Sequence, residues 1–196
     1  MRREFRRQIV HISGLLFIIL AYFSGRTLAI AYFGMIALFF LSYSLYVRSH
    51  EKRMMRLLHR MESRFREIAL AFERESDFEN PFKGAFLFYS ACTLTLIIFP
   101  FFIALAACSI LAIGDSLSTI VGLVMGRKKI HGNKTLEGSL AFFFSSIVVA
   151  SAFVSPQTAL VGSLAGVFAE IQGRIDDNLA IPLLSAFLML VFSLVA

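Results

Sequence analysis

The sequence predicts an all-α protein that forms a polytopic membrane helix bundle, with residues 1–196 as a single integral membrane domain. Two observations support this prediction. Hydrophobic residues make up 58% of the chain and the mean hydropathy is +0.76, and both values lie well above those of soluble globular proteins. Long apolar runs are also separated by short polar connections along most of the chain, which is the pattern of successive membrane-spanning helices.

About seven of these apolar runs are expected to form transmembrane helices. The first follows a basic segment and could resemble a signal peptide, but it has no small-residue cleavage pattern, so we expect it to be retained as a helix. The others are bounded by Gly, Pro or charged residues, which end apolar helices. The expected spans are residues 9–24, 28–47, 84–99, 102–125, 136–154, 158–172 and 178–196.

The distribution of basic residues predicts the orientation of these spans. If the N-terminus is cytosolic, segments 1–8, 48–83, 126–135 and 173–177 face the cytosol, and they hold every Lys and Arg of the chain except Arg26. Such an asymmetry is typical of the positive-inside rule. It accounts for the net charge of +6 without a nucleic-acid partner. All candidate site residues would then lie at the cytosolic face.

Residues 48–79 form a polar insertion with a helical pattern. Apolar residues recur in it at spacings of three and four, which is typical of an amphipathic helix. We expect this helix to lie on the membrane or to fold against the protein, and the alternative is a coiled coil that joins two copies in a homodimer. The apolar positions are Met54, Leu58, Met61, Phe65, Ile68 and Phe72.

The fourth apolar run contains one carboxylate, Asp115, which a helix would place on the same face as Thr119, Gly122 and Gly126. An ionisable residue within a membrane-length segment is costly to bury and therefore suggests a functional site. Interhelical hydrogen bonding is the alternative role.

The connection 126–135 is basic and leads into the fifth run. It is not a P-loop, because five residues separate Gly126 from Gly132 and Asn133 precedes the lysine. Thr135 is the expected N-cap of the next helix, and the unpaired N–H groups of a helix start favour a phosphate. For Lys128 a role in topology alone is the alternative. The candidate nucleotide- and phosphate-binding residues here are Arg127, Lys128, Lys134, Thr135, Glu137, Gly138 and Ser139.

Three further carboxylates lie near the same predicted membrane surface. Glu170 ends the sixth run, on a helix face with two glycines that predict close packing, and Asp176 and Asp177 follow in a short loop. Together with Asp115 they could bind one or two Mg²⁺ ions, which prefer oxygen ligands. We expect Asp115, Asp176 and Asp177 to be the metal ligands, with Glu170 as a further ligand or a base.

Four blocks of the sequence resemble the CTP-dependent lipid-alcohol kinases of the dolichol kinase, phytol kinase and yeast-type diacylglycerol kinase group, which are related to the phosphatidate cytidylyltransferases. The third block below is the most specific. Many members of the group have Ala where this chain has Ser116 or Ser118. The blocks are Arg7-x-x-x-His11, Gly114-Asp115 through Gly126-Arg127-Lys128, Lys134-Thr135-x-Glu137-Gly138-Ser139-x-Ala141, and Glu170 with Asp176-Asp177-Asn178-Leu179-x-Ile181-Pro182.

The resemblance implies a kinase that transfers the γ-phosphoryl group of CTP to a membrane lipid alcohol with a divalent metal. Dolichol or another polyprenol is the first expected acceptor, followed by phytol or geranylgeraniol and by diacylglycerol. Asp115, Glu170 and Lys134 would then be catalytic, and Arg7 and His11 would line the nucleotide site. A CTP:lipid-phosphate cytidylyltransferase is the nearest alternative, and a transporter or structural membrane protein is the alternative of another class.

Overall fold

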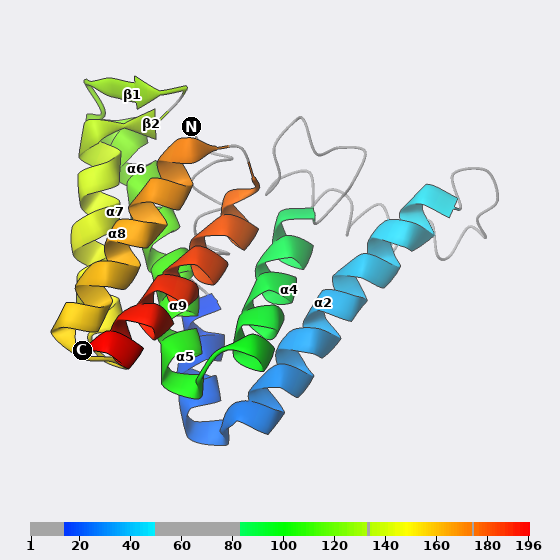
Figure 1. Cartoon of the computed structure of the whole chain (residues 1–196). Helices are drawn as coiled ribbons and strands as arrows, with labels where there is room; N and C mark the ends of the chain where they lie inside the picture. The colour runs from blue at the N-terminus through cyan, green and yellow to red at the C-terminus, as the bar shows by residue number, and fades with distance from the viewer. Residues whose placement is uncertain (1–13, 50–82, 133, 174) are drawn as a thin grey trace.

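The computed structural model describes residues 14–49, 83–132, 134–173 and 175–196. Within these residues the chain forms seven helical rods, which match the seven predicted apolar runs to within a few residues (Figure 1). In chain order the elements are Gly14–Ser24, α2 (Arg26–Ser49), α4 (Lys83–Ile98), α5 (Phe101–Ser109), η2 (Ile110–Asp115), α6 (Ser116–Met125), β1 (Lys129–His131), β2 (Lys134–Thr135), α7 (Leu136–Ala150), α8 (Pro156–Gln172) and α9 (Asp177–Val195).

Within the part of the chain that the structure describes, three helical stretches are long and apolar enough to cross a membrane, namely Arg26–Leu45, Phe101–Met125 and Asp177–Val195. The helices Gly14–Ser24, Lys83–Ile98 and Leu136–Ala150 are apolar but shorter. The chain therefore carries the helices of an integral membrane protein. That all seven rods cross the membrane stays a prediction.

The rod formed by α5, η2 and α6 is the centre of the bundle. It is by far the most buried of the three candidate spans, because α7, α8 and α9 pack around it, whereas α2 packs on α4 at the edge of the bundle (Figure 1). Glycines permit the close crossings. A Cβ atom on Gly162 would lie 2.6 Å from the sulfur of Met189, and one on Gly166 would lie 2.8 Å from the Phe142 ring. The predicted packing role of these glycines is confirmed.

Arg26, which is the one basic residue predicted to face away from the cytosol, has a structural role. Its Nε atom donates to the carbonyl oxygen of Leu96 over 2.9 Å, and a terminal guanidinium nitrogen donates to that of Ile97 over 2.7 Å. Both carbonyls belong to the last turn of α4, where helical partners are lacking and a positive charge is favoured by the helix dipole.

The end of α6, the start of α7, the end of α8 and the start of α9 meet at one end of the bundle, opposite the C-terminal end of α9 (Figure 1). Between α6 and α7 the chain forms an antiparallel hairpin from β1 and β2, which the all-α prediction did not include. Gly132 turns the hairpin with a φ of 54°, a conformation that glycine adopts without strain. The backbone N–H of Leu136 also donates to the Lys128 carbonyl over 2.8 Å.

Two groups of predicted features lie outside the described residues. These are Arg7 and His11 in the first segment, and the amphipathic helix of the 48–79 insertion beyond Ser49, where α2 ends. The homodimer that this insertion could form stays a prediction.

Candidate active site at one end of the bundle

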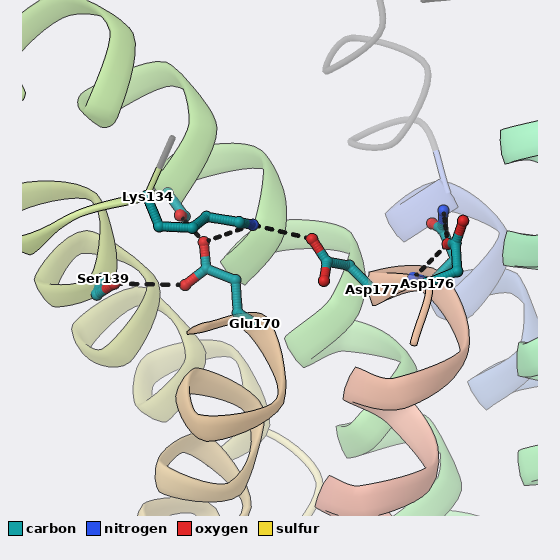
Figure 2. Close-up of polar contacts among 7 residues, drawn as sticks. Lys134, Ser139, Glu170, Asp176 and Asp177 are labelled. Carbon is teal, nitrogen blue, oxygen red and sulfur yellow. Dashed lines mark hydrogen bonds and ion pairs between the residues drawn. The ribbon is translucent and has the colours of Figure 1, made fainter. Parts of the chain in front are cut away.

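Lys134 lies at the centre of the candidate site. Its ammonium nitrogen donates to Oε1 of Glu170 over 3.1 Å and to Oδ2 of Asp177 over 2.9 Å. Figure 2 shows the lysine from β2 reaching between the carboxylate at the end of α8 and the carboxylate at the start of α9. The cation thereby joins β2 to two carboxylates that lie 36 and 43 residues further along the chain.

Glu170 is completely buried, as expected from its place on the helix face of Gly162 and Gly166. The Ser118 hydroxyl donates to Oε1 of Glu170, and the Ser139 hydroxyl donates to Oε2 over 3.5 Å. With Lys134, these groups supply the hydrogen bonds that a buried carboxylate requires. Ser118 was not among the predicted site residues. Its position one helical turn after Asp115 was the signal that could have identified it.

Asp115 lies at the end of η2, a short π-helical stretch inside the central rod. Such stretches are frequent at functional sites, and sequence patterns gave no sign of this one. The side chain is 6% exposed, and no described residue forms a hydrogen bond or ion pair with its carboxylate. Its charge nevertheless acts on Lys134, so Asp115 lies close enough to belong electrostatically to the cluster.

The neighbouring carboxylates determine the protonation state of Lys134. Burial lowers the pKa of Lys134, but the carboxylates of Asp115, Glu170 and Asp177 raise it by more, and the net pKa is raised. Lys134 therefore stays protonated across the physiological range. The free protein has one permanent cation among three carboxylates.

Thr135 caps α7, as predicted, because its Oγ1 atom accepts the backbone N–H of Gly138 over 3.2 Å. The N–H of Gly138 is consequently already used and would have to leave the cap before it could donate to a phosphate. Gly138 also brings two helices together. A Cβ atom there would lie 2.8 Å from the Ser118 carbonyl oxygen and 3.4 Å from the Cα atom of Gly122.

Glu137 holds the basic connection in place. Its Oε2 atom accepts the backbone N–H groups of Arg127 and Lys128 over 3.1 and 3.3 Å. The carboxylate thus positions Arg127 and Lys128, whose side chains are exposed, instead of pointing at the cluster around Lys134.

The two adjacent aspartates have different environments. Asp177 binds Lys134, whereas Oδ1 of Asp176 accepts the backbone N–H and the side-chain amide of Asn178 over 3.1 and 3.0 Å. Asp176 is therefore the N-cap of α9. Figure 2 shows its carboxylate on the far side of Asp177 from Lys134. Its predicted role as a metal ligand stays a prediction, and the carboxylate that shares Lys134 with Asp177 is Glu170.

The donor set suits a metal that is bound with a nucleotide. Among the described residues, no group of three His, Cys, Asp or Glu side chains lies close enough to form a complete metal site. Mg²⁺ bound to a nucleotide, however, usually takes only one or two protein carboxylates and completes its shell with phosphates and water. Glu170 and Asp177 approach one point, which Lys134 occupies, and that arrangement fits such an ion.

No model of a protein family matches the chain, and no solved structure matches it. Four curated relatives do, and three of them match more than half of this chain. An uncharacterized protein of Rickettsia prowazekii is 27% identical over 92% of this chain and 90% of its own length. The CTP-dependent diacylglycerol kinase 1 of Schizosaccharomyces pombe is 30% identical over 59% of this chain and 62% of its own length. A probable chloroplastic phytol kinase 3 of Glycine max is 32% identical over 59% of this chain and 43% of its own length.

The match spans less than two thirds of either named kinase. The names of both relatives describe the phosphorylation of a lipid alcohol. Over more than half of its length, the chain is therefore similar to CTP-dependent and related lipid kinases.

Proposed function

We propose that this protein is a membrane kinase that transfers the γ-phosphoryl group of CTP to a lipid alcohol. The observation that carries the proposal is the cluster in which Lys134 is held by Glu170 and Asp177 beside Asp115. Phosphoryl transfer depends mainly on positioning and on charges around the phosphates. A cluster of carboxylates around one cation, next to a basic hairpin, supplies both signs of charge. The similarity to two lipid kinases agrees with this chemistry.

Each part of the site has a distinct role in the proposed reaction. Lys134, Arg127 and Lys128 bind the phosphates, and Glu137 keeps the last two in position. The alcohol oxygen forms a bond to the γ-phosphorus while the bond from that phosphorus to the bridging oxygen breaks, and CDP leaves. The alcohol proton passes to a carboxylate of the cluster. Arg7 and His11 join the nucleotide site in this proposal on the strength of the sequence resemblance alone.

Glu170 and Asp177, which approach one point, would hold the divalent metal together with the phosphates and water. Bound Mg²⁺ neutralises phosphate charge and orients the nucleotide for in-line transfer. Other residues of the chain position these groups. Ser118 and Ser139 fix the Glu170 carboxylate, and Thr135 and the glycines around it set the distance between α6 and α7.

The acceptor enters from the bilayer, because the cluster lies at the end of apolar helices. Polyprenols such as dolichol are the first expected acceptors from the sequence resemblance, whereas the named relatives favour diacylglycerol and phytol. The acceptor is therefore best identified by direct competition.

A labelled-nucleotide assay tests the proposal. The purified protein is incubated with Mg²⁺, CTP labelled at the γ-phosphorus, and a panel of dolichol, phytol, geranylgeraniol and diacylglycerol. We expect label in one lipid monophosphate and a clear preference for CTP over ATP. Equal rates with both nucleotides would remove the preference for CTP. No labelled lipid with any acceptor, from protein that binds nucleotide, would contradict the kinase function.

The same assay with CTP labelled at the α-phosphorus separates the two enzyme classes. A kinase leaves this label in CDP, whereas a cytidylyltransferase acting on a lipid phosphate would place it in a CDP-lipid and release pyrophosphate. A transporter or structural protein would transfer neither label.

We further propose that the site faces the cytosol, because the basic hairpin lies at the site end of the bundle (Figure 1). Cysteines introduced at Lys129 and Ala196 test this orientation, since the native Cys92 and Cys108 are buried and contribute little background. An impermeant thiol reagent should reach position 129 from the cytosolic side only and position 196 from the opposite side only. Labelling of both positions from one side would contradict the seven-span topology.

A further inference from the structure

The two residues of β2, Lys134 and Thr135, have side chains on opposite sides of the strand, as successive strand residues do. The Lys134 ammonium reaches Glu170 and Asp177. The Thr135 side chain instead lies against α6 and the first turn of α7, and the residue is 8% exposed. The short strand therefore carries the cation of the site on one side and a buried side chain on the other.

Three glycines make room for the Thr135 side chain. A Cβ atom on Gly122 of α6 would lie 3.1 Å from Oγ1 of Thr135, and a Cβ atom on Gly138 of α7 would lie at the same distance. A Cβ atom on Gly126, which follows α6, would lie 2.9 Å from Oγ1 and 2.7 Å from the Cγ2 methyl carbon. Such contacts are tighter than packed side chains tolerate, so both the hydroxyl and the methyl group of Thr135 have a defined place.

Hydrogen bonds fix the backbone on both sides of this contact. Oγ1 of Thr135 accepts the N–H of Gly138 over 3.2 Å, and the N–H of Leu136 donates to the Lys128 carbonyl over 2.8 Å. The backbone that carries Lys134 is thus held from the next residue in the chain. This support matters because a lysine ammonium stands on a flexible four-carbon stem.

We infer that Thr135 is a positioning residue for the proposed reaction, because its hydroxyl and methyl groups set where the Lys134 ammonium lies. Within the described part of the chain, the Thr135 side chain hydrogen-bonds to the Gly138 N–H and to neither carboxylate of the cluster. Its effect on the site therefore passes through the adjacent lysine. The inference rests on the proposed function only where it assigns Lys134 to the phosphates.

Amine acylation tests the positioning of Lys134 without nucleotide or lipid acceptor. Thr135→Val keeps the shape of the side chain but cannot accept the Gly138 N–H. The carboxylates around Lys134 raise its pKa, so looser contacts should leave more of its amine uncharged and reactive. In the full chain in detergent, followed by mass spectrometry, we expect Thr135→Val to speed acylation of Lys134 at least about threefold, and that of the exposed Lys129 to stay constant.

A second helix cap supplies the matched control. Ser155 caps α8 at the opposite end of the bundle by accepting the N–H of Thr158 over 3.3 Å, so Ser155→Ala removes a cap far from Lys134 and should not change its acylation. Gly122→Ala is a second test variant, because the added carbon would press on Oγ1 of Thr135, and it should also speed the acylation. Unchanged acylation in both test variants, or an equal rise with Ser155→Ala, would overturn the inference.

A double-mutant cycle extends the test to the reaction. Thr135→Val should lower kcat/KM for CTP roughly 5- to 10-fold in wild type. In the Lys134→Gln background the same change should cost less than about twofold, because its effect requires the lysine. Equal losses in both backgrounds would refute action through Lys134. If acylation rises as expected but wild-type protein transfers no phosphoryl group, the proposed function is wrong and the positioning of Lys134 stands.

Discussion

Replacing Lys134 with glutamine tests the candidate site most directly, because the same side chain holds two carboxylates and is proposed to bind phosphate. Glutamine keeps a polar end but removes the charge. Lys129→Gln is the matched control, since Lys129 lies on the same hairpin with its side chain exposed. If the lysines of this connection only mark the cytosolic side, the two variants should behave alike.

The expected size of the effect follows from the contacts of Lys134. A hydrogen bond that involves a charged group contributes about 1.5–3 kcal/mol, so loss of one contact to the phosphates should lower kcat/KM roughly 10- to 150-fold. The free protein should also lose stability, because Glu170 loses its cation. Ser118 and Ser139 still donate to Glu170, and Lys134 is 27% exposed, so we expect a loss of only about 1–3 kcal/mol.

Two assays separate these effects. Steady-state kinetics with varied CTP should show lower kcat as well as higher KM if the contact strengthens as charge develops during transfer. Thermal unfolding in detergent should show a Tm lower by about 3–10 °C for Lys134→Gln. Lys129→Gln should match wild type in both. Indistinguishable kinetics for the two variants would refute the role of Lys134 in phosphate binding.

Three further predictions concern the groups around Lys134. Asp115→Asn should lower kcat at least about 100-fold, more than is typical for an outer-shell partner of a metal, while the protein still folds and inserts; near-normal turnover at limiting Mg²⁺ would make Asp115 a packing residue. Glu137→Gln should raise the KM for CTP a few-fold with a smaller change in kcat, because it loosens the basic connection, and an unchanged KM would speak against this positioning role. Gly138→Ala should lower the free energy of unfolding by about 1–3 kcal/mol, because the added carbon is overpacked against Ser118. Gly84→Ala is the control and should have little effect, since no described atom lies within 4 Å of the added carbon. Equal effects of the two substitutions would contradict the close approach of α6 and α7.

The helices could be predicted because apolar length is a local property of the sequence. Each described rod coincides with one predicted run, and the Thr135 cap also depended only on local residue types. The π-helical stretch before Asp115 could not be predicted, since no sequence period distinguishes it from an α-helix. It places Asp115 at the cluster through packing of Gly114 against Phe142 and Ser146, and those contacts exist only in the folded bundle.

The assignment of neighbouring carboxylates shows a second limit. Asp176 and Asp177 are equivalent by residue type, but Asp176 precedes α9 with a non-helical ψ of 129°, whereas Asp177 is the first residue of the helix. One therefore caps α9 while the other faces Lys134. Likewise, Glu137 was expected at the nucleotide, and only the path of the hairpin directs it to the backbone of Arg127 and Lys128. The residue types of the site could be predicted from the sequence. Their individual roles could not, because these depend on where each helix begins and on the path of the hairpin.

The charges of the site also bear on how a nucleotide could bind there. An acidic cluster and a triphosphate repel each other unless cations lie between them. The free protein supplies one such cation at the cluster, Lys134, and carries Arg127 and Lys128 on the exposed connection nearby. One ammonium among three carboxylates leaves the cluster negative, so metal-free CTP should bind poorly even though the hairpin is basic. A nucleotide that brings its own divalent cation should reverse this balance, because the cation adds positive charge between the carboxylates and the phosphates. The arrangement therefore favours the metal complex of the nucleotide over either component alone.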